Sequence, residues 1–158
     1  MAGTNTIATA ALILHTLAAV IWVGGMFFAH QALRPAAVAL EPGPRLLLWR
    51  RVLGRFFAWV IAAIVLLLAS GFTMISAVLG GFGRIGLYIQ LMIGIGILMM
   101  LLFFHLYFAP WRRFRAAVAR EDWMEGGRQL AQIRTIVTIN LALGLVVVAI
   151  GSSGRYWG

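Results

Sequence analysis

The 158-residue chain contains no cysteine and no lysine. Without cysteine it cannot form disulfides, iron–sulfur centres or thiolate metal sites, and without lysine it cannot form a Schiff base. It is also poor in charge, because 11% of its residues are charged, whereas a soluble domain carries about 25%. What remains is apolar, with 63% hydrophobic residues. This composition excludes an ordinary soluble domain and indicates a membrane protein.

Four apolar runs are long enough to cross a membrane, which takes about 20 helical residues. They cover approximately residues 7–33, 56–79, 85–109 and 133–151. The first run is not expected to be a signal peptide, because it has no basic start, a long apolar core and no small-residue cleavage site. The sequence therefore predicts a single all-α domain, an integral membrane four-helix bundle.

Arginine accounts for all the basic charge, with 13 residues against four acids and a net charge of +9. Eleven arginines lie between the first and second runs, between the third and fourth, or, as Arg134 does, at the start of the fourth, whereas Arg84 and Arg155 lie elsewhere. The positive-inside rule then predicts that both termini are outside. We expect a multi-pass protein of a bacterial-type inner (plasma) membrane, with periplasmic termini. The basic charge serves topology and lipid contact, so no nucleic-acid partner is expected.

Local signals predict where the helices end. Pro35 disfavours helical geometry at the residue before it, so the first helix is expected to stop near Leu33. Gly126–Gly127 is expected to break the helix that follows the third run. The arginine- and leucine-rich segment 45–57 either lies along the inner interface or begins the second span. Residues 81–86 spell G-x-G-x-x-G, but no strand precedes them, so we expect a tight turn rather than a nucleotide site.

The three histidines, His15, His30 and His105, are the candidate functional residues. An ionisable side chain inside a membrane span is costly and is a functional candidate by default. At 1.5 Å per residue, His15 lies ~5 Å outside the midplane, His30 ~18 Å inside it and His105 ~13 Å inside it. The similar depths of His30 and His105 predict an inner pair, whereas His15 belongs to an outer site.

Helical angles add a prediction about which side chains face each other. At 100° per residue, Trp22 and Met26 share a stripe of the first span with His15 and His30. A similar stripe on the third span consists of Gln90, Gly94, Leu101 and His105. If the stripes face each other, His30 meets His105 in an inner polar layer. His15 then meets Gln90 in an outer layer, a site for a quinone or a proton.

Other interpretations of these residues stay open. His30 and His105 lie near enough to the inner surface for their rings to reach water. His15 can be a structural residue that is hydrogen-bonded to Gln90 or Asn140. Asn140 is typical of an interhelical hydrogen bond, and methionines such as Met26 more often pack than bind metal.

Two imidazoles across a helical bundle suit haem b iron or copper. Arg34, Arg112 and Arg113 lie within two turns of the inner pair, and arginines suit anionic propionates. They are poor neighbours for a bare copper ion, and the spans hold no carboxylate or thiolate to offset its charge. These residues favour haem b, with His30 and His105 as axial ligands. Copper is the alternative, with ligands from His15, His30, His105 and Met26.

Three segments resemble a known family. LHTLAAVIWVGGMFF carries His15 and Trp22, FFHLYFAPWRR carries His105, and IRTIVTINLALGL carries Arg134 and Asn140. In this order they resemble CopD-type copper-resistance membrane proteins and, more distantly, HemJ-type protoporphyrinogen oxidases. The resemblance implies a four-span fold and places His15, His105, Arg134 and Asn140 in the family pattern.

The resemblance also implies two activities. CopD-type proteins handle copper at the inner membrane, whereas HemJ-type proteins bind haem b and oxidise protoporphyrinogen IX. The chain lacks the lysine that HemJ-type proteins carry in the third span. Residues and resemblance together predict a haem b redox protein, an oxidoreductase using a quinol or a porphyrinogen. Copper binding or transport is the alternative, and a structural subunit without cofactor is the third. A quinone, a redox protein or a second copy of the chain are candidate partners besides lipid.

Overall fold

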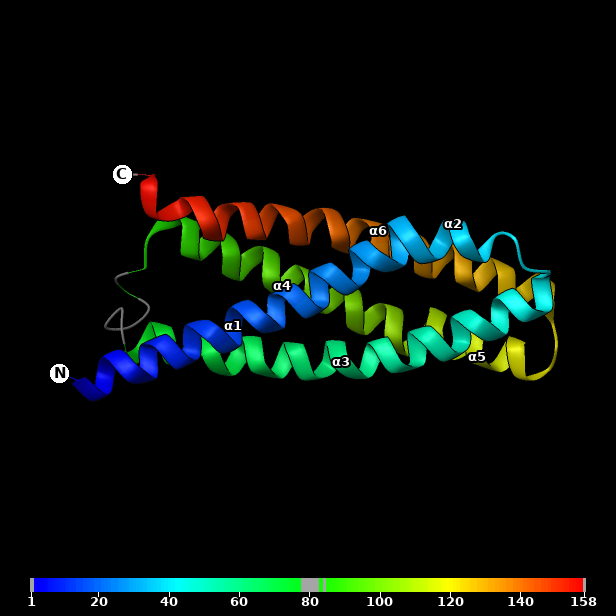
Figure 1. The fold of residues 1–158 in the computed structure, drawn as a ribbon, viewed down its shortest axis with the longest axis horizontal. Coiled ribbons are helices and arrows are strands. Elements are labelled where there is room, and N and C mark those ends of the chain that lie inside the picture. The colour runs from blue at the N-terminus through cyan, green and yellow to red at the C-terminus, as the bar shows by residue number, and fades with distance from the viewer. Residues whose placement is uncertain (1, 78–82, 84, 158) are drawn as a thin grey trace.

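The computed structural model describes residues 2–77, 83 and 85–157. Figure 1 shows long helices lying side by side, with the two ends of the chain at the same end of the bundle. The elements are α1 (Ala2–Phe28), the π-helical turn η1 (Ala29–Leu33), α2 (Arg34–Ala37), α3 (Pro42–Ala77), α4 (Leu87–Phe108), α5 (Pro110–Ala119), α6 (Trp123–Ser153) and the 3₁₀ turn η3 (Gly154–Tyr156). Of the turn expected at 81–86, residues 81, 82 and 84 lie outside the described residues.

Four helical stretches are long and apolar enough to cross a membrane. They are Thr6–Ala37, Pro42–Ala77, Leu87–Ala119 and Trp123–Ser153. This confirms the predicted all-α fold with four apolar helices. Segment 45–57 lies within α3, so it begins the second crossing.

The first crossing does not end at Leu33, so the prediction made from Pro35 was wrong. The backbone stays helical at Arg34, with φ −59° and ψ −52°, and α2 continues to Ala37. The turn before the proline is π-helical, and its wider i→i+5 turn accommodates a ring that would clash in an α-helix interior. His30 consequently lies in a bulged turn, a feature that is frequent at functional sites.

The break expected at Gly126–Gly127 lies earlier in the chain. Helix α5 ends at Ala119 and α6 begins at Trp123, and both glycines are helical. Glu121 adopts a left-handed conformation with φ 57°, which turns the chain between the two helices. Gly126 allows α6 to pack closely on α3, because a Cβ there would lie 3.0 Å from Leu46 Cδ1.

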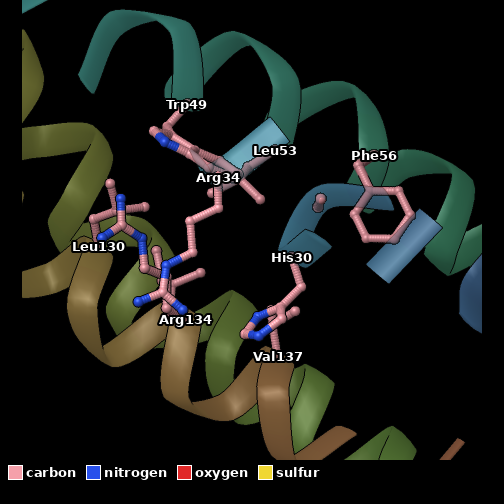
Figure 2. Close-up of a pocket in the computed structure, with 10 residues that line it drawn as sticks. His30, Arg34, Trp49, Leu53, Phe56, Leu130, Arg134 and Val137 are labelled. Atoms are coloured by element: carbon pink, nitrogen blue, oxygen red, sulfur yellow. The ribbon is translucent and has the colours of Figure 1, made fainter. Parts of the chain in front are cut away.

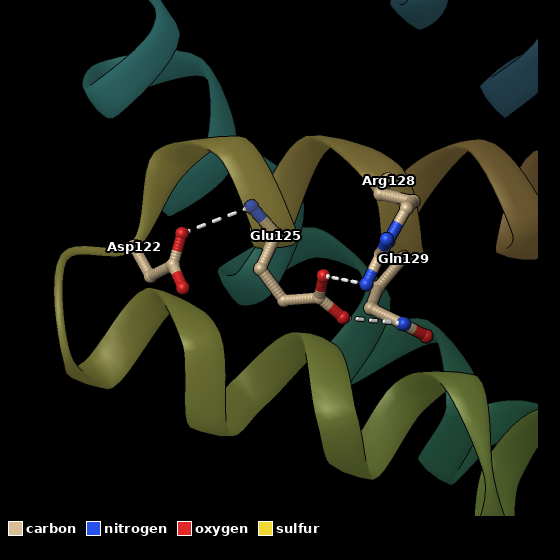
Figure 3. A network of polar contacts seen from close by, with 4 residues as sticks. All are labelled: Asp122, Glu125, Arg128 and Gln129. Carbon is tan, nitrogen blue, oxygen red and sulfur yellow. Dashed lines mark hydrogen bonds and ion pairs between the residues drawn. The ribbon is translucent and has the colours of Figure 1, made fainter.

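A capping network fixes the start of α6 (Figure 3). The Asp122 carboxylate accepts a hydrogen bond from the Glu125 backbone N–H at 3.0 Å. Glu125 in turn pairs with Arg128 at 2.5 Å and accepts from Gln129 Nε2 at 2.7 Å. An N-cap carboxylate satisfies backbone donors that the first turn leaves unpaired and favours the positive end of the helix dipole. The stabilisation from this cap and its ion pair offsets the low helix propensity of Gly126 and Gly127.

Helix α1 crosses the bundle obliquely. In Figure 1 it begins beside the C-terminal half of α3 and ends beside the N-terminal half of α6. The side-chain contacts agree, because His15 of α1 meets Ser70 of α3 and His30 meets Thr138 of α6. The α1 crossing therefore gives its two histidines different neighbouring helices.

The core holds a chain of aromatic rings that joins α1, α3, α4 and α5. Phe57 lies at its centre, with ring centroids 5.6 Å from Phe103 and 5.2 Å from Trp111. Trp22 of α1 meets Phe103 edge-on at 6.2 Å. The outer faces of the helices expose large apolar residues such as Leu12, Val20 and Leu68. A water-exposed protein would bury such faces, so they are the surface that contacts lipid.

Gly144 lies where α6 meets α1 and α4. A Cβ at this position would be 2.9 Å from Val23 Cγ2 and 3.2 Å from Met99 Cε. We expect Gly144→Leu to force the helices apart and to lower the free energy of unfolding by about 1–3 kcal/mol. Unfolding of the purified protein in mixed micelles, followed by helical circular dichroism, measures this loss.

Gly94→Leu is the matched control for this prediction. Gly94 lies in α4, and a Cβ there would have no neighbour within 4 Å. Leucine at this exposed position gains helix propensity without a clash, so stability should not fall. Equal losses for the two variants would show that the close approach at Gly144 is not what holds these helices together.

Candidate functional site

His15 has a fixed orientation between α1 and α3. Its Nδ1 lies 2.9 Å from Ser70 Oγ, and Ser70 is buried. The Ser70 hydroxyl donates its single proton to the Leu66 carbonyl at 2.5 Å. It can therefore only accept from the histidine, so Nδ1 carries the proton and Nε2 carries the lone pair.

His30 repeats this arrangement at the other end of α1. Its Nδ1 lies 3.4 Å from Thr138 Oγ1 of α6. Thr138 donates its own proton to the Arg134 carbonyl at 2.9 Å, so this hydroxyl too is an acceptor for the imidazole. The contact is longer than the one at His15 and correspondingly weaker. His15 of α1 and His30 of η1 thus direct Nδ1–H to a hydroxyl and keep Nε2 available as a ligand.

Helix α4 turns its predicted polar stripe outward. All four residues of that stripe are exposed: Gln90, Gly94, Leu101 and His105. The buried face of α4 is instead formed by Met99, Phe103 and Leu106. The two stripes therefore do not face each other, because hydrophobic packing of the aromatic side of α4 decides which face is buried.

His15, Gln90 and Asn140 have hydrogen-bond partners other than those expected from the sequence. Gln90 donates to the Ile85 carbonyl of its own segment at 3.2 Å, while Ser70 meets His15. His105 is exposed and does not line the cavity that holds His30. Asn140 donates to the Met99 carbonyl at 3.1 Å, which links α6 to α4.

A cavity of about 30 Å³ lies beside His30, between η1, α3 and α6. Figure 2 shows Arg34, Trp49 and Arg134 gathered on one side of the His30 ring. The Arg134 guanidinium lies 5.7 Å from the centre of the Trp49 ring. Arg112 and Arg113, which were also expected near this site, are exposed on α5 and do not line the cavity. Trp49 was not anticipated as a site residue, because nothing in its local sequence distinguishes it from packing.

Two methionines of the spans pack in the core. Met26 and Met99 are buried among apolar side chains. Within residues 2–77, 83 and 85–157, no three histidine, aspartate or glutamate side chains converge in a way that could hold a metal ion. A metal bound among the described residues would therefore take at most two of these side chains and its remaining ligands from other groups.

The chain matches a known protein family. Residues 50–153, which are 104 of the 158 residues, match the family model of CopD, copper resistance protein D. The chain belongs to the CopD family. With four apolar helices, it is a multi-pass membrane protein that contacts the lipid bilayer. No curated protein and no solved structure matches it.

The family match begins within α3. It includes Ser70, His105, Arg134 and Thr138, whereas α1 with His15 and η1 with His30 lie before it. The CopD resemblance drawn from the sequence is therefore confirmed over α3 to α6. The histidines of α1 are assigned from their geometry alone.

Proposed function

We propose that this CopD-family protein binds copper inside the membrane bundle, with His15 as its principal imidazole ligand. The observation that carries the proposal is the hydrogen bond from His15 Nδ1 to Ser70, whose own proton is committed to Leu66. Metal-bound histidines almost always donate their other ring N–H to an acceptor, which fixes the ring and raises its basicity. Family membership supplies the metal, because CopD is a copper resistance family.

His30 provides a second imidazole along α1. The two histidines are 15 residues apart, which corresponds to ~22 Å of helix, so they cannot share one ion. Met26 lies one turn before His30, and its thioether is a soft ligand of the kind that selects Cu(I). Copper held first at one histidine and then at the other would cross most of the bilayer. We further propose that this happens in a bacterial-type inner membrane, with periplasmic termini, as the arginine distribution favours.

Electrostatics makes His15 the better site of the two. His30 has Arg34 and Arg134 beside its cavity, and both repel a cation. Ser70 and the backbone around His15 are neutral. A copper ion near His15 therefore meets hydrogen-bond acceptors and no opposing charge.

Haem b, held by His30 and His105 in a redox protein that uses a quinone, is the second candidate. It is favoured by Arg34 and Arg134 near His30, since arginines pair with propionates. The fit is poor, because a cavity of about 30 Å³ has room for about two water molecules and His105 lies outside it. Binding would require the helices to separate.

One measurement on the purified full chain distinguishes the two candidates. The protein is loaded with Cu(I) under reducing, anaerobic conditions, desalted, and examined by elemental analysis and visible spectroscopy. We expect retained copper near stoichiometry and no Soret band. A Soret band that shifts on reduction and disappears in His105→Ala would instead establish haem. A protein that retains neither copper nor haem would refute both candidates and favour a structural subunit.

A further inference from the structure

Two buried N–H groups beside His30 have no acceptor. Trp49 is only 3% exposed, and its Nε1 is buried without a hydrogen-bond partner among the described residues. Arg134 Nε is in the same situation. Both residues line the cavity between η1, α3 and α6. Buried donors are almost always paired with protein, water or an ion, so this pair indicates an acceptor that comes from outside the chain.

The charge around the cavity indicates what that acceptor is. Arg34 and Arg134 line it, and Arg45 lies close enough to repel Arg134 as Arg34 does. In the part of the chain that the structure describes, none of these three arginines has an ion pair. Arg45 and Arg134 are partly buried and Arg34 is exposed, and like charges that are partly removed from water are costly unless an opposite charge is present. An anion would supply that charge, whereas a water molecule would supply only the hydrogen bonds.

The size of the cavity limits the anion. Its volume is about 30 Å³, and one water needs roughly 10–15 Å³ on the same scale. Leu53, Ile133 and Val137 form the apolar part of the wall. A halide fits within this volume, whereas a phosphate with a lipid attached would extend beyond it.

We propose that this cavity binds a small inorganic monoanion of the size of chloride, held by Trp49 Nε1–H, Arg134 Nε–H and the charge of Arg34. The anion joins α3 to α6, because one donor comes from each helix. It also offsets the positive charge beside His30. The proposal does not depend on copper binding, and its test needs no copper.

Thermal unfolding of the copper-free full chain in detergent tests the proposal. Sodium chloride replaces sodium gluconate at constant ionic strength, because gluconate is too large for the cavity. We expect a saturable rise in Tm with chloride, reproduced by bromide. Trp49→Phe keeps the aromatic packing but removes the donor, so chloride affinity should fall about five-fold. Arg134→Gln should abolish the effect.

Arg51→Gln is the control, because it removes the same charge as Arg134→Gln from an exposed position of α3 outside the cavity. It should keep the wild-type chloride response. If the two cavity variants do not fold, the line width of ³⁵Cl in wild-type solutions, with bromide as competitor, measures binding directly. An absence of chloride dependence, or equal responses in Arg51→Gln and Arg134→Gln, would overturn the proposal and leave water as the acceptor.

Discussion

Replacing Phe57 with alanine is expected to lower the free energy of unfolding by about 3–5 kcal/mol, the usual cost of truncating a buried phenylalanine. Phe57 is 2% exposed and packs edge-on against Phe103, Tyr107 and Trp111. Each such aromatic pair contributes about 0.5–1.5 kcal/mol beyond the area it buries. Lipid cannot fill the resulting space, because it is enclosed by α3, α4 and α5. Reversible unfolding in mixed micelles, monitored by circular dichroism, gives the change.

Phe28→Ala is the matched control for Phe57→Ala. Phe28 ends α1 and is 61% exposed, so its ring faces lipid and its removal leaves no internal cavity. The stability of this variant should stay within about 0.5 kcal/mol of the wild type. A loss at Phe57 no larger than the loss at Phe28 would show that the aromatic chain does not hold the bundle together.

The four crossings could be predicted from the sequence because a bilayer fixes both the length and the apolar character of a spanning helix. Helix ends were harder to predict. Pro35 was expected to stop the first helix, but a π-helical turn absorbs it. Gly126–Gly127 was expected to break a helix, but the Asp122 cap and close packing against Leu46 keep it intact. In both cases the helix-breaking tendency of a residue type was overridden by the structure around it, which its own short sequence segment does not reveal.

Residue counting predicts a depth for each histidine but not the direction in which its side chain points. Residue counting places His30 and His105 at similar depths, since it depends only on the helical rise. It does not say which face of α4 is buried. That depends on the packing of Phe103 against Phe57 and Trp22, and this packing turns His105 outward.

The hydrogen-bond partners of the α1 histidines lie on other helices. Ser70 and Thr138 are 55 and 108 residues away from His15 and His30, and only the oblique path of α1 brings them together. A usable signal was present, because a serine or threonine within an apolar span commonly bonds across helices. The pairing of Trp49 with Arg134 carried no such signal.

The shared pattern at the two histidines has a consequence for copper. In each case a hydroxyl gives its proton to a carbonyl one turn earlier and then serves as an acceptor for the imidazole. In the neutral imidazole this fixes the proton on Nδ1 and leaves Nε2 free, which is the form that binds metal. The hydroxyls therefore belong to the proposed site as positioning residues, although they do not touch the metal.

If the copper proposal is correct, His15→Ala is expected to remove the principal site, and Ser70→Ala to weaken it by about 10–100-fold, the usual cost of losing such a supporting hydrogen bond. The fold should survive, because an interhelical hydrogen bond in a membrane contributes about 0.6 kcal/mol. Competition with a chromogenic Cu(I) chelator measures the affinity of each variant. Ser76→Ala is the control, because Ser76 is exposed and bonds only to backbone carbonyls of its own helix. Wild-type affinity in His15→Ala would refute the ligand assignment. Wild-type affinity in Ser70→Ala alone would show that another group orients the ring.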